Sequence, residues 1–408
     1  MDRIILVTSS FPYYPGEQFL ETEIKYYDGL AVTIMPMSSN ERIRKVSSNI
    51  EVDKYLTNQP KSLGVRIKYL LKAFFKNKLV YQEIVLNKVF SVKKLKGLFV
   101  SISNYERFYD IFDNYFEKEK DLSGTVIYTY WNTEATYALQ SLKKKYGYKL
   151  VSRIHGFDLY KERRPGSYIP LKHLFTNHID KIFTITESAN EYLSKTYGFK
   201  NQILELSKLG VNDCLINSQP SVNRALSLVS CSFLVDLKRI DKIIDALFVL
   251  SKTCPLIKFN WIHIGSGSLE NTLKQYAIKK LSNLDGIRYD FLGFLDNQEV
   301  YEFYRNNRID VFVNVSESEG VPVSIMEAMS CHIPIIAPDI GGISDMVSNG
   351  VNGILLSGEC RVDELVKALS NVEFFKIQET RENSYKQYLE KYNARNNYTK
   401  FVETLKGL

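Results

Sequence analysis

Short apolar runs alternate with amphipathic stretches along the whole chain. The runs, rich in β-branched residues, cover positions 4–8, 125–129, 150–154 and 181–186 in the first half, and 225–232, 259–264, 289–292, 309–315 and 333–337 in the second. Such runs are typical of parallel strands that are buried on both faces, and the stretches between them, such as 133–146, have helical spacing. The pattern therefore predicts an α/β protein with helices on both faces of parallel sheets.

A polar connection around residues 208–220 separates the two series of runs. The chain of 408 residues is long enough for two α/β domains of roughly 200 residues each. We place the boundary at residue 213, which predicts an N-terminal domain at 1–212 and a C-terminal domain at 213–380. The tail, 381–408, carries aromatic and apolar residues at roughly helical spacing and is predicted to be a final helix.

Composition and cysteine content favour a soluble protein over a membrane-spanning, secreted or zinc-binding one. Charged residues make up 24% and hydrophobic residues 45% of the chain, as in ordinary soluble domains. No apolar run approaches the roughly 20 residues of a membrane helix, and the amino terminus has the pattern of a first strand, not of a signal peptide. The five cysteines are odd in number and include no C-x-x-C pair, which predicts reduced thiols, a cytoplasmic protein and no zinc site.

Positive charge is concentrated in residues 61–100, which hold ten Lys or Arg and one acid, Glu83. Lysines recur every four residues beside a row of large apolar side chains, so one helix face is cationic and the adjoining face is apolar. The rows are Lys68, Lys72 and Lys76, and Leu71, Phe75 and Leu79. This pattern predicts contact with an anionic membrane surface, and the alternative is a solvated face over a core face. Nucleic acid is not an expected partner, because the segment has no recognisable nucleic-acid motif.

The most specific pattern is Ser316-Glu-Ser-Glu-Gly-Val-Pro-Val-Ser-Ile-Met-Glu-Ala-Met-Ser330, which follows an apolar strand. It places Glu319 and Glu327 eight positions apart, with Pro322 between them at the expected first turn of a helix. Unpaired N–H groups near the helix start would offer an anion site, and the carboxylates would accept hydrogen bonds from hydroxyls. A sugar nucleotide has both kinds of group. In the alternative reading, Glu327 is a solvated helix charge and its apolar neighbours are only a buried helix face.

This pattern resembles the Glu-x7-Glu signature of the retaining glycosyltransferases of family 4. The resemblance is strongest over residues 291–354 and fair over residues 128–211. It implies the GT-B fold: two Rossmann-like domains that face a cleft, with a C-terminal helix that crosses back to the first domain. It also implies transfer of a sugar from a nucleotide-sugar donor to a hydroxyl with retention of configuration. In this family the leaving phosphate is thought to help deprotonate the acceptor, so no enzymic nucleophile is expected.

The resemblance assigns roles to the residues of this pattern. Glu327 is expected to bind the ribose hydroxyls, and Glu319 is expected to bind hydroxyls of the donor sugar and to be catalytic. The backbone between them is expected to hold the sugar and phosphate, which adds Gly320, Val321, Pro322, Val323 and Ser324 to the predicted donor site.

A second loop, Arg153-Ile-His-Gly-Phe-Asp158, also follows a predicted strand. A lone histidine is more often a structural residue than a catalytic one. This loop, however, resembles the His-Gly-x-Asp loop of family 4, in which the histidine faces the donor sugar. The resemblance implies that His155 forms a hydrogen bond with the sugar near the reacting centre and is catalytic, with Arg153 and Asp158 as supports.

Two cations are candidates for the diphosphate. Lys238, after the strand at 225–232, matches a lysine that the family uses there, where it would stabilise charge that develops on the leaving group. Phe233 stands where the family has an arginine. Arg239 is the candidate to supply the missing charge.

Two glycine-bearing loops complete the predicted donor site. Gly265 begins a G-x-G after the strand at 259–264, and the resemblance makes this loop part of the nucleotide pocket. The third glycine of a dinucleotide fingerprint is replaced by Glu270, which disfavours an NAD dehydrogenase. Gly16, in the amino-terminal loop, is expected to touch the donor or acceptor. No D-x-D motif is present, so we expect no metal and no cofactor.

The predicted function is that of a hexosyltransferase-type enzyme. It would transfer a sugar to a glycan or polyprenyl-linked acceptor in bacterial surface polysaccharide biosynthesis. It would be cytoplasmic or peripheral on the inner membrane face. The alternatives are a non-catalytic GT-B subunit that supports a partner transferase, and a sugar-nucleotide-processing enzyme of the same fold.

Overall fold

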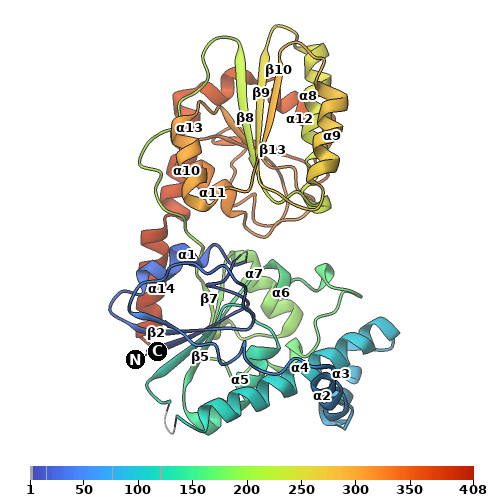
Figure 1. Cartoon of the computed structure of the whole chain (residues 1–408), viewed down its shortest axis with the longest axis vertical. Coiled ribbons are helices and arrows are strands. Elements are labelled where there is room, and N and C mark those ends of the chain that lie inside the picture. The colour runs from blue at the N-terminus through green and yellow to red at the C-terminus, as the bar shows by residue number, and fades with distance from the viewer. Residues whose placement is uncertain (1–2, 15, 76, 120–121) are drawn as a thin grey trace. The chain divides into compact units, whose positions relative to one another are not determined.

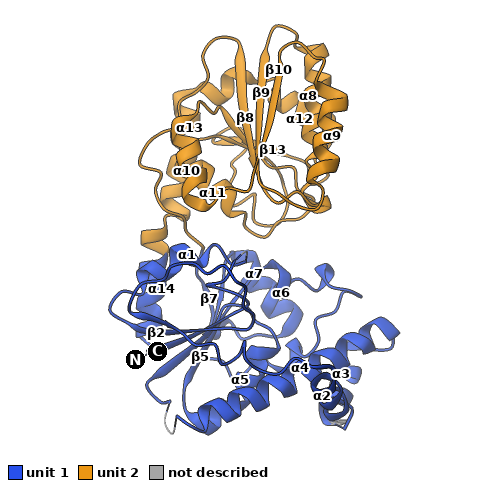
Figure 2. Ribbon diagram, viewed as in Figure 1, with its two compact units in different colours: residues 1–208, 398–408 blue, residues 209–397 orange. Residues whose placement is uncertain are grey.

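Two parallel sheets organise the chain in the computed structural model, which describes residues 3–14, 16–75, 77–119 and 122–408. Unit 1 comprises Met1–Lys208 together with Tyr398–Leu408, and unit 2 comprises Leu209–Asn397 (Figures 1 and 2). Helices cover both sheets, so the predicted α/β fold class with two parallel sheets is confirmed. The units meet in the sequence at residue 209, and the sequence analysis placed the boundary at 213.

The sheet of unit 1 has seven strands in the order β3-β2-β1-β4-β5-β6-β7, and all neighbours are parallel. The strands are β1 Arg3–Thr8, β2 Ala31–Pro36, β3 Ile50–Val52, β4 Thr125–Thr129, β5 Lys149–Ile154, β6 Lys181–Thr184 and β7 Leu204–Leu206. Successive side chains of β1 enter different cores: Ile4 and Leu6 join one cluster, and Ile5 and Val7 join the other. A strand that is apolar at every position can therefore be buried on both faces.

The helices of unit 1 are α1 Leu20–Glu23, α2 Leu63–Phe75, α3 Asn77–Asn87, α4 Val92–Phe116, α5 Glu134–Tyr146, α6 Gly156–Leu159 and α7 Glu187–Tyr192. The helix predicted at 133–146 is confirmed as α5, which ends at Gly147 in the left-handed conformation that favours glycine. The basic segment forms α2, α3 and the start of α4, and α2 and α3 pack against α4.

The sheet of unit 2 has six parallel strands in the order β10-β9-β8-β11-β12-β13. They are β8 Ala225–Cys231, β9 Lys258–Ile264, β10 Ile287–Gly293, β11 Val311–Val313, β12 Ile335–Pro338 and β13 Gly353–Leu356. The helices are α8 Asp241–Thr253, α9 Glu270–Leu281, α10 Asn297–Asn306, α11 Val323–Ser330, α12 Val362–Leu369 and α13 Gln378–Lys391. Figure 1 shows α8, α9 and α12 on one face of this sheet and α10, α11 and α13 on the other.

The tail forms two helices, α13 and α14 (Ala394–Lys406), where the sequence pattern indicated one. The helix is interrupted where the backbone at residues 392–394 pairs with Val211. Val211 N donates to Tyr392 O at 2.9 Å, and Ala394 N donates to Val211 O at 3.0 Å. Gly210 permits this approach, since a Cβ there would lie 2.5 Å from the Cα of Ala394. Beyond the break, Phe401 and Leu405 are buried in the core of unit 1.

The prediction of reduced thiols is wrong for two of the five cysteines. Cys214 and Cys331 are 117 positions apart in the sequence, but the fold brings their Cα atoms to 5.1 Å and they form a disulfide. Sequence spacing could not reveal the pair, because the proximity depends on how the connection at 209–220 passes the end of α11. Cys231, Cys254 and Cys360 are free.

No helix in the described residues is long and apolar enough to span a membrane.

Candidate active site

The loop between β11 and α11 contains most of the predicted donor-site residues. It leaves the carboxyl end of β11, the edge at which parallel sheets bind ligands. Pro322 caps α11 in an extended conformation, and the helix begins at Val323, one position later than expected. The first N–H groups of an α-helix have no partner within the helix. Val323 and Ser324 are partly exposed at this helix start, which is therefore suited to bind an anion.

Glu319 is the central residue of this loop and is 8% exposed. Its Oε1 accepts a hydrogen bond from Lys238 Nζ at 2.5 Å and from Asn314 Nδ2 at 3.2 Å. The loops that carry Glu319 and Lys238 are also tied through their backbones, because Glu317 N donates to Leu237 O at 2.9 Å. The structure thus brings together the predicted lysine and the first predicted glutamate, 81 positions apart in the sequence.

Glu327 lies on α11, is 6% exposed and accepts a hydrogen bond from Asn297 Nδ2. It is a buried, bonded carboxylate, so it is not a solvated helix charge. Glu327 and Lys238 lie near the same thiol, that of the partly buried Cys231: desolvation raises the pKa of this thiol, the charge of Glu327 raises it further, and Lys238 lowers it. Lys238, Glu319 and Glu327 therefore belong to one region of unit 2.

Two asparagines of this region were missed in the sequence analysis. Asn314 follows the last residue of an apolar strand, and its Oδ1 also accepts from Ser316 N at 2.9 Å. Asn297 is the first residue of α10 and lies within a capping box formed by Asp296 and Glu299. A polar residue at the end of an apolar strand and a D-x-x-E helix start are both visible in the sequence. These signals could have identified the two residues as candidates, but not their glutamate partners.

Glycines allow the loops of this region to pack closely. Gly265 has φ 132°, and a Cβ there would come 1.9 Å from Ser232 O, in the loop that leads to Lys238. Gly341, with φ 56°, packs on the other side of the region, where a Cβ would lie 2.1 Å from Glu319 O. Gly320 O accepts from Gly342 N at 2.7 Å. These contacts fix the backbone on which Glu319 and Lys238 are carried.

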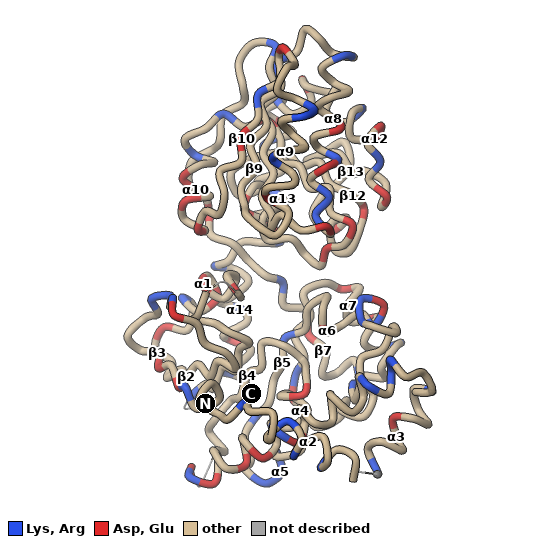
Figure 3. The backbone as a smooth tube through the Cα atoms, turned by 45° about the vertical axis from the view of Figure 1, so that its right-hand side comes forward, with Lys and Arg blue, Asp and Glu red and all other residues tan. Residues whose placement is uncertain are grey.

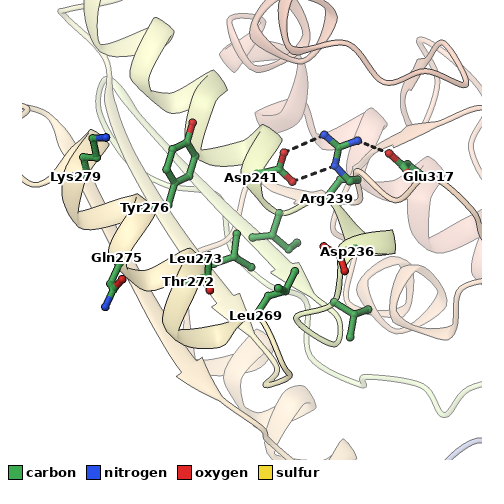
Figure 4. A pocket seen from close by; sticks show the side chains of 12 residues that line it. Asp236, Arg239, Asp241, Leu269, Thr272, Leu273, Gln275, Tyr276, Lys279 and Glu317 are labelled. Carbon is green, nitrogen blue, oxygen red and sulfur yellow. Dashed lines mark hydrogen bonds and ion pairs between the residues drawn. The ribbon is translucent and has the colours of Figure 1, made fainter.

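Arg239 has a different environment from that of Lys238. Its guanidinium donates to both carboxylate oxygens of Asp241, at 3.2 and 3.0 Å, and to Glu317, and these bonds raise its pKa (Figure 4). It lines a cavity of about 740 Å³ together with Asp236, Tyr276 and other residues between the 235–241 loop and α9. Lys238 and Glu319 are not among the lining residues. A phosphate would therefore have to compete with two carboxylates for Arg239.

His155 lies in unit 1, at the carboxyl end of β5, and is 7% exposed. Three aromatic rings surround its imidazole, with ring centroids at 4.6 Å for Trp131, 4.8 Å for Tyr130 and 5.8 Å for Phe19. Neither ring nitrogen has a hydrogen-bond partner. Burial lowers the pKa of His155 well below its usual value, and the nearby charge of Arg153 lowers it further. The residue is thus a neutral imidazole with one unused donor and one unused acceptor.

The backbone of the His155 loop is fixed by Asp158. Its Oδ1 accepts from His155 N at 2.7 Å, and its Oδ2 accepts from Asn132 N at 2.6 Å. Lys172, fully buried, donates to Asn132 Oδ1 at 2.8 Å and to Asn132 O at 3.1 Å. Burial lowers the pKa of Lys172 to about 8, and the charge of Asp158 opposes this shift. Nothing in the sequence indicated Lys172, because it lies in an irregular segment without a recognisable pattern.

Arg153 acts on the scaffold of unit 1. It is fully buried, donates to the Tyr128 hydroxyl at 2.8 Å and to Ser207 O at 2.7 Å, and lies 3.3 Å from a carboxylate oxygen of Glu23. The side chain therefore links β5 to β4, to the segment that follows β7 and to helix α1. This placement agrees with the supporting role that the resemblance implied.

In the amino-terminal loop, Glu17, which follows Gly16, forms several hydrogen bonds. The Glu17 carboxylate accepts from the backbone N–H groups of residues 9–11, at 2.9, 2.7 and 2.7 Å, and from Trp131 Nε1 at 2.6 Å. Glu17 thus connects this loop to the aromatic ring nearest His155. A Cβ at Gly16 would lie 2.7 Å from Ser10 Oγ, so the glycine allows the loop to fold tightly. The predicted contact of Gly16 with a substrate stays a prediction.

Among the described residues, no group of three or more His, Cys, Asp or Glu side chains is placed to hold a metal ion.

Known proteins resemble the chain in both sequence and fold. Residues 217–390 match the family described as glycosyl transferases group 1. An uncharacterized glycosyltransferase of Methanocaldococcus jannaschii is 26% identical over 315 residues, which are 77% of this chain and 82% of that protein. The putative colanic acid biosynthesis glycosyltransferase WcaL of Escherichia coli K12 is 22% identical over 214 residues, and the match covers 51% of each chain, about half the length of WcaL.

The fold has close counterparts among solved structures. Anabaena HepE in complex with UDP and glucose superposes with a TM-score of 0.63 over 99% of both chains, at 17% identity. At this level of identity the likeness shows the fold alone, and it agrees with the two parallel sheets described above. The chain has the GT-B fold, and the family match together with the glycosyltransferase relatives supports its assignment as a GT-B glycosyltransferase.

Proposed function

We propose that this protein is a retaining glycosyltransferase of family 4 that transfers a hexose from a nucleotide-sugar donor to a hydroxyl. The observation that carries the proposal is the arrangement at the carboxyl end of β11: Glu319 pairs with Lys238, and α11 starts beside Glu319 and carries Glu327. A carboxylate can accept hydrogen bonds from sugar hydroxyls, and a helix start and an ammonium group can bind phosphate. These are the groups that recognition of a sugar nucleotide requires.

Each side chain has a role in the proposed reaction. Lys238 stabilises the negative charge that develops on the departing diphosphate. Glu319 binds hydroxyls of the donor sugar, and Glu327, oriented by Asn297, binds the ribose hydroxyls. The backbone from Gly320 to Ser324 holds the sugar and the phosphate.

The chemical step exchanges one bond at the anomeric carbon. The bond to the diphosphate oxygen breaks and takes its electron pair to the diphosphate. The bond to the acceptor oxygen forms on the same face, and the acceptor proton passes to the leaving phosphate. His155 is assigned a hydrogen bond to the donor sugar. Its lowered pKa suits a neutral hydrogen-bonding role and not that of an acid.

The acceptor that we propose is a glycan or a polyprenyl-linked sugar of bacterial surface polysaccharide biosynthesis. WcaL carries colanic acid biosynthesis in its name, which supports this context. HepE was solved with UDP and glucose, which supports a nucleotide-sugar donor. A lipid-linked acceptor implies a protein of the cytoplasm that also works peripherally at the inner membrane face. We also propose that transfer needs no metal ion, so that EDTA leaves the rate unchanged.

The first test is a thermal-unfolding screen against UDP, GDP, ADP and CDP sugars. A ligand that binds only the folded state raises the unfolding midpoint, and a selective shift with one nucleotide identifies the donor class. A transfer assay with that donor and lipid-linked acceptors follows. The competing proposal is a non-catalytic subunit, favoured by Phe233, which is half-exposed where the family has an arginine. Absence of any shift at millimolar ligand would support that alternative and contradict ours.

A further inference from the structure

Helix α2 exposes a continuous row of large apolar side chains. Tyr69 and Ala73 are buried on the side that packs against α4. The opposite side carries exposed residues at helical spacing, with Phe74 62% and Phe75 76% exposed. We call this row the α2 face; it comprises Leu63, Ile67, Leu70, Leu71, Phe74 and Phe75. An exposed apolar row of this kind on a soluble fold indicates an interaction surface.

The α2 face also contains a groove. Four of its side chains, with Phe99 of α4, line an apolar groove of about 280 Å³. The rings of Phe74 and Phe99 stack with centroids 6.1 Å apart. The apolar row predicted from the sequence is therefore only partly core: Leu79 packs on the core cluster, whereas Leu71 and Phe75 are exposed.

Positive charge surrounds the α2 face. Lys61, Arg66 and Lys68 are exposed on or next to α2. Further exposed lysines follow at Lys78 on α3, at Lys88 between α3 and α4, and at Lys93 and Lys96 on α4. The one acid of residues 61–100, Glu83, is buried and accepts from Asn87 at 3.0 Å and from Tyr168. Figure 3 marks the Lys and Arg positions of this region along the backbone.

The structure changes one part of the predicted cationic row. Lys72 pairs with Glu106 at 3.0 Å and with Asp110 at 2.7 Å, so its charge is neutralised within unit 1. Lys76 lies outside the described residues. The charge available to a partner therefore comes from Arg66 and Lys68 of α2 and from the lysines of α3 and α4.

We propose that the α2 face docks on an anionic lipid bilayer. Apolar side chains would enter the boundary between headgroups and acyl chains, and the surrounding Lys and Arg would meet lipid phosphates. A second copy of the chain is a poorer partner, because two faces rich in Lys and Arg without an exposed acid would repel each other. The link between this surface and a lipid-linked acceptor rests on the proposed function, but the membrane contact itself does not.

Vesicle flotation of the purified full chain tests the proposal. We expect binding to vesicles of 70% phosphatidylcholine and 30% phosphatidylglycerol, and at least tenfold weaker binding to pure phosphatidylcholine. Phe74→Ser with Phe75→Ser should reduce binding to the anionic vesicles at least tenfold, and so should Arg66→Glu with Lys68→Glu. The matched control is Leu256→Ser, at an exposed leucine of unit 2, which should bind as the wild type does. All of these positions are exposed, so the variants should fold.

Either of two flotation results would overturn the proposal: no flotation of the wild type with anionic vesicles, or equal flotation of the wild type and both α2 variants. A dimer in light scattering that the Phe74→Ser/Phe75→Ser variant dissolves would identify a second copy as the occupant and would equally overturn it. Donor-induced thermal shifts are measured on the same samples. If no donor raises the unfolding midpoint of the wild type, the proposed function is contradicted, whereas the inference of membrane binding is unaffected.

Discussion

Replacement of Lys238 by methionine probes the ion pair on which the proposed site depends. The Lys238 side chain is 20% exposed and that of Glu319 is 9% exposed, so the change leaves a carboxylate in a largely buried position without its cation. Removal of one partner from a fully buried pair costs about 3–5 kcal/mol. Because water reaches part of Lys238, we expect about 2–3 kcal/mol here. For a domain of this size, that corresponds to a fall in the melting temperature of about 4–12 °C.

The assay is thermal unfolding of the wild type, Lys238→Met, and Lys238→Met with Glu319→Gln. The double variant removes the uncompensated charge but keeps an acceptor for Asn314, so it should recover at least half of the loss. Lys367→Met, at an exposed lysine of α12, is the matched control and should melt within about 1 °C of the wild type. If Lys238→Met melts at the same temperature as the wild type, or if the double variant melts no higher than Lys238→Met, the ion pair is not a stabilising element of a buried site.

Further substitutions test other parts of the structure. Glu327→Ala should weaken nucleotide binding by about 1.5–3 kcal/mol, or roughly 10- to 150-fold in Kd measured by titration, because it removes a charged hydrogen-bond acceptor. His155→Ala should spare donor affinity but lower turnover by about ten- to a hundredfold in a transfer assay. Gly265→Ala should lower the free energy of unfolding by about 3 kcal/mol or more in denaturant titration, since its Cβ would clash with the backbone at residue 232. His263 is buried with a pKa lowered to about 4, so the unfolded state binds more protons below pH 6.5. His263 should therefore contribute a loss of about 1.4 kcal/mol of stability for each unit by which the pH falls from 6.5 to 4, and the profile of His263→Gln should be flatter by that amount.

The sequence was most informative where the physical cause is local. The apolar runs predicted strands of both sheets because a parallel strand buried on both faces must be apolar at nearly every position. Strands β2, β3, β7 and β13 were not predicted. Of these, β3 and β7 have only three residues each, too few for a recognisable pattern. The helix start at Val323 was predicted to within one position because proline before a helix is a local signal.

Contacts between residues that are far apart in the sequence could not be predicted from sequence patterns. The Lys238–Glu319 pair depends on how two loops meet at the carboxyl ends of neighbouring strands β8 and β11. The resemblance named both residues but could not show that they contact each other. The prediction of reduced thiols failed at Cys214 and Cys331 for the same reason, since the number and spacing of cysteines in the sequence do not give distances between them.

The Glu-x7-Glu pattern did not reveal that Glu319 and Glu327 have different partners. Glu319 lies against an ammonium group and an amide, in a loop with several backbone ties to its neighbours. Glu327 lies on a regular helix and receives an amide donor from Asn297. A carboxylate beside a cation is suited to the part of the nucleotide sugar next to the departing diphosphate, where charge develops. A carboxylate beside a neutral amide is suited to hydroxyl groups, which stay uncharged during the reaction. These different environments support the proposed roles, in which Glu319 contacts the reacting sugar and Glu327 contacts the ribose.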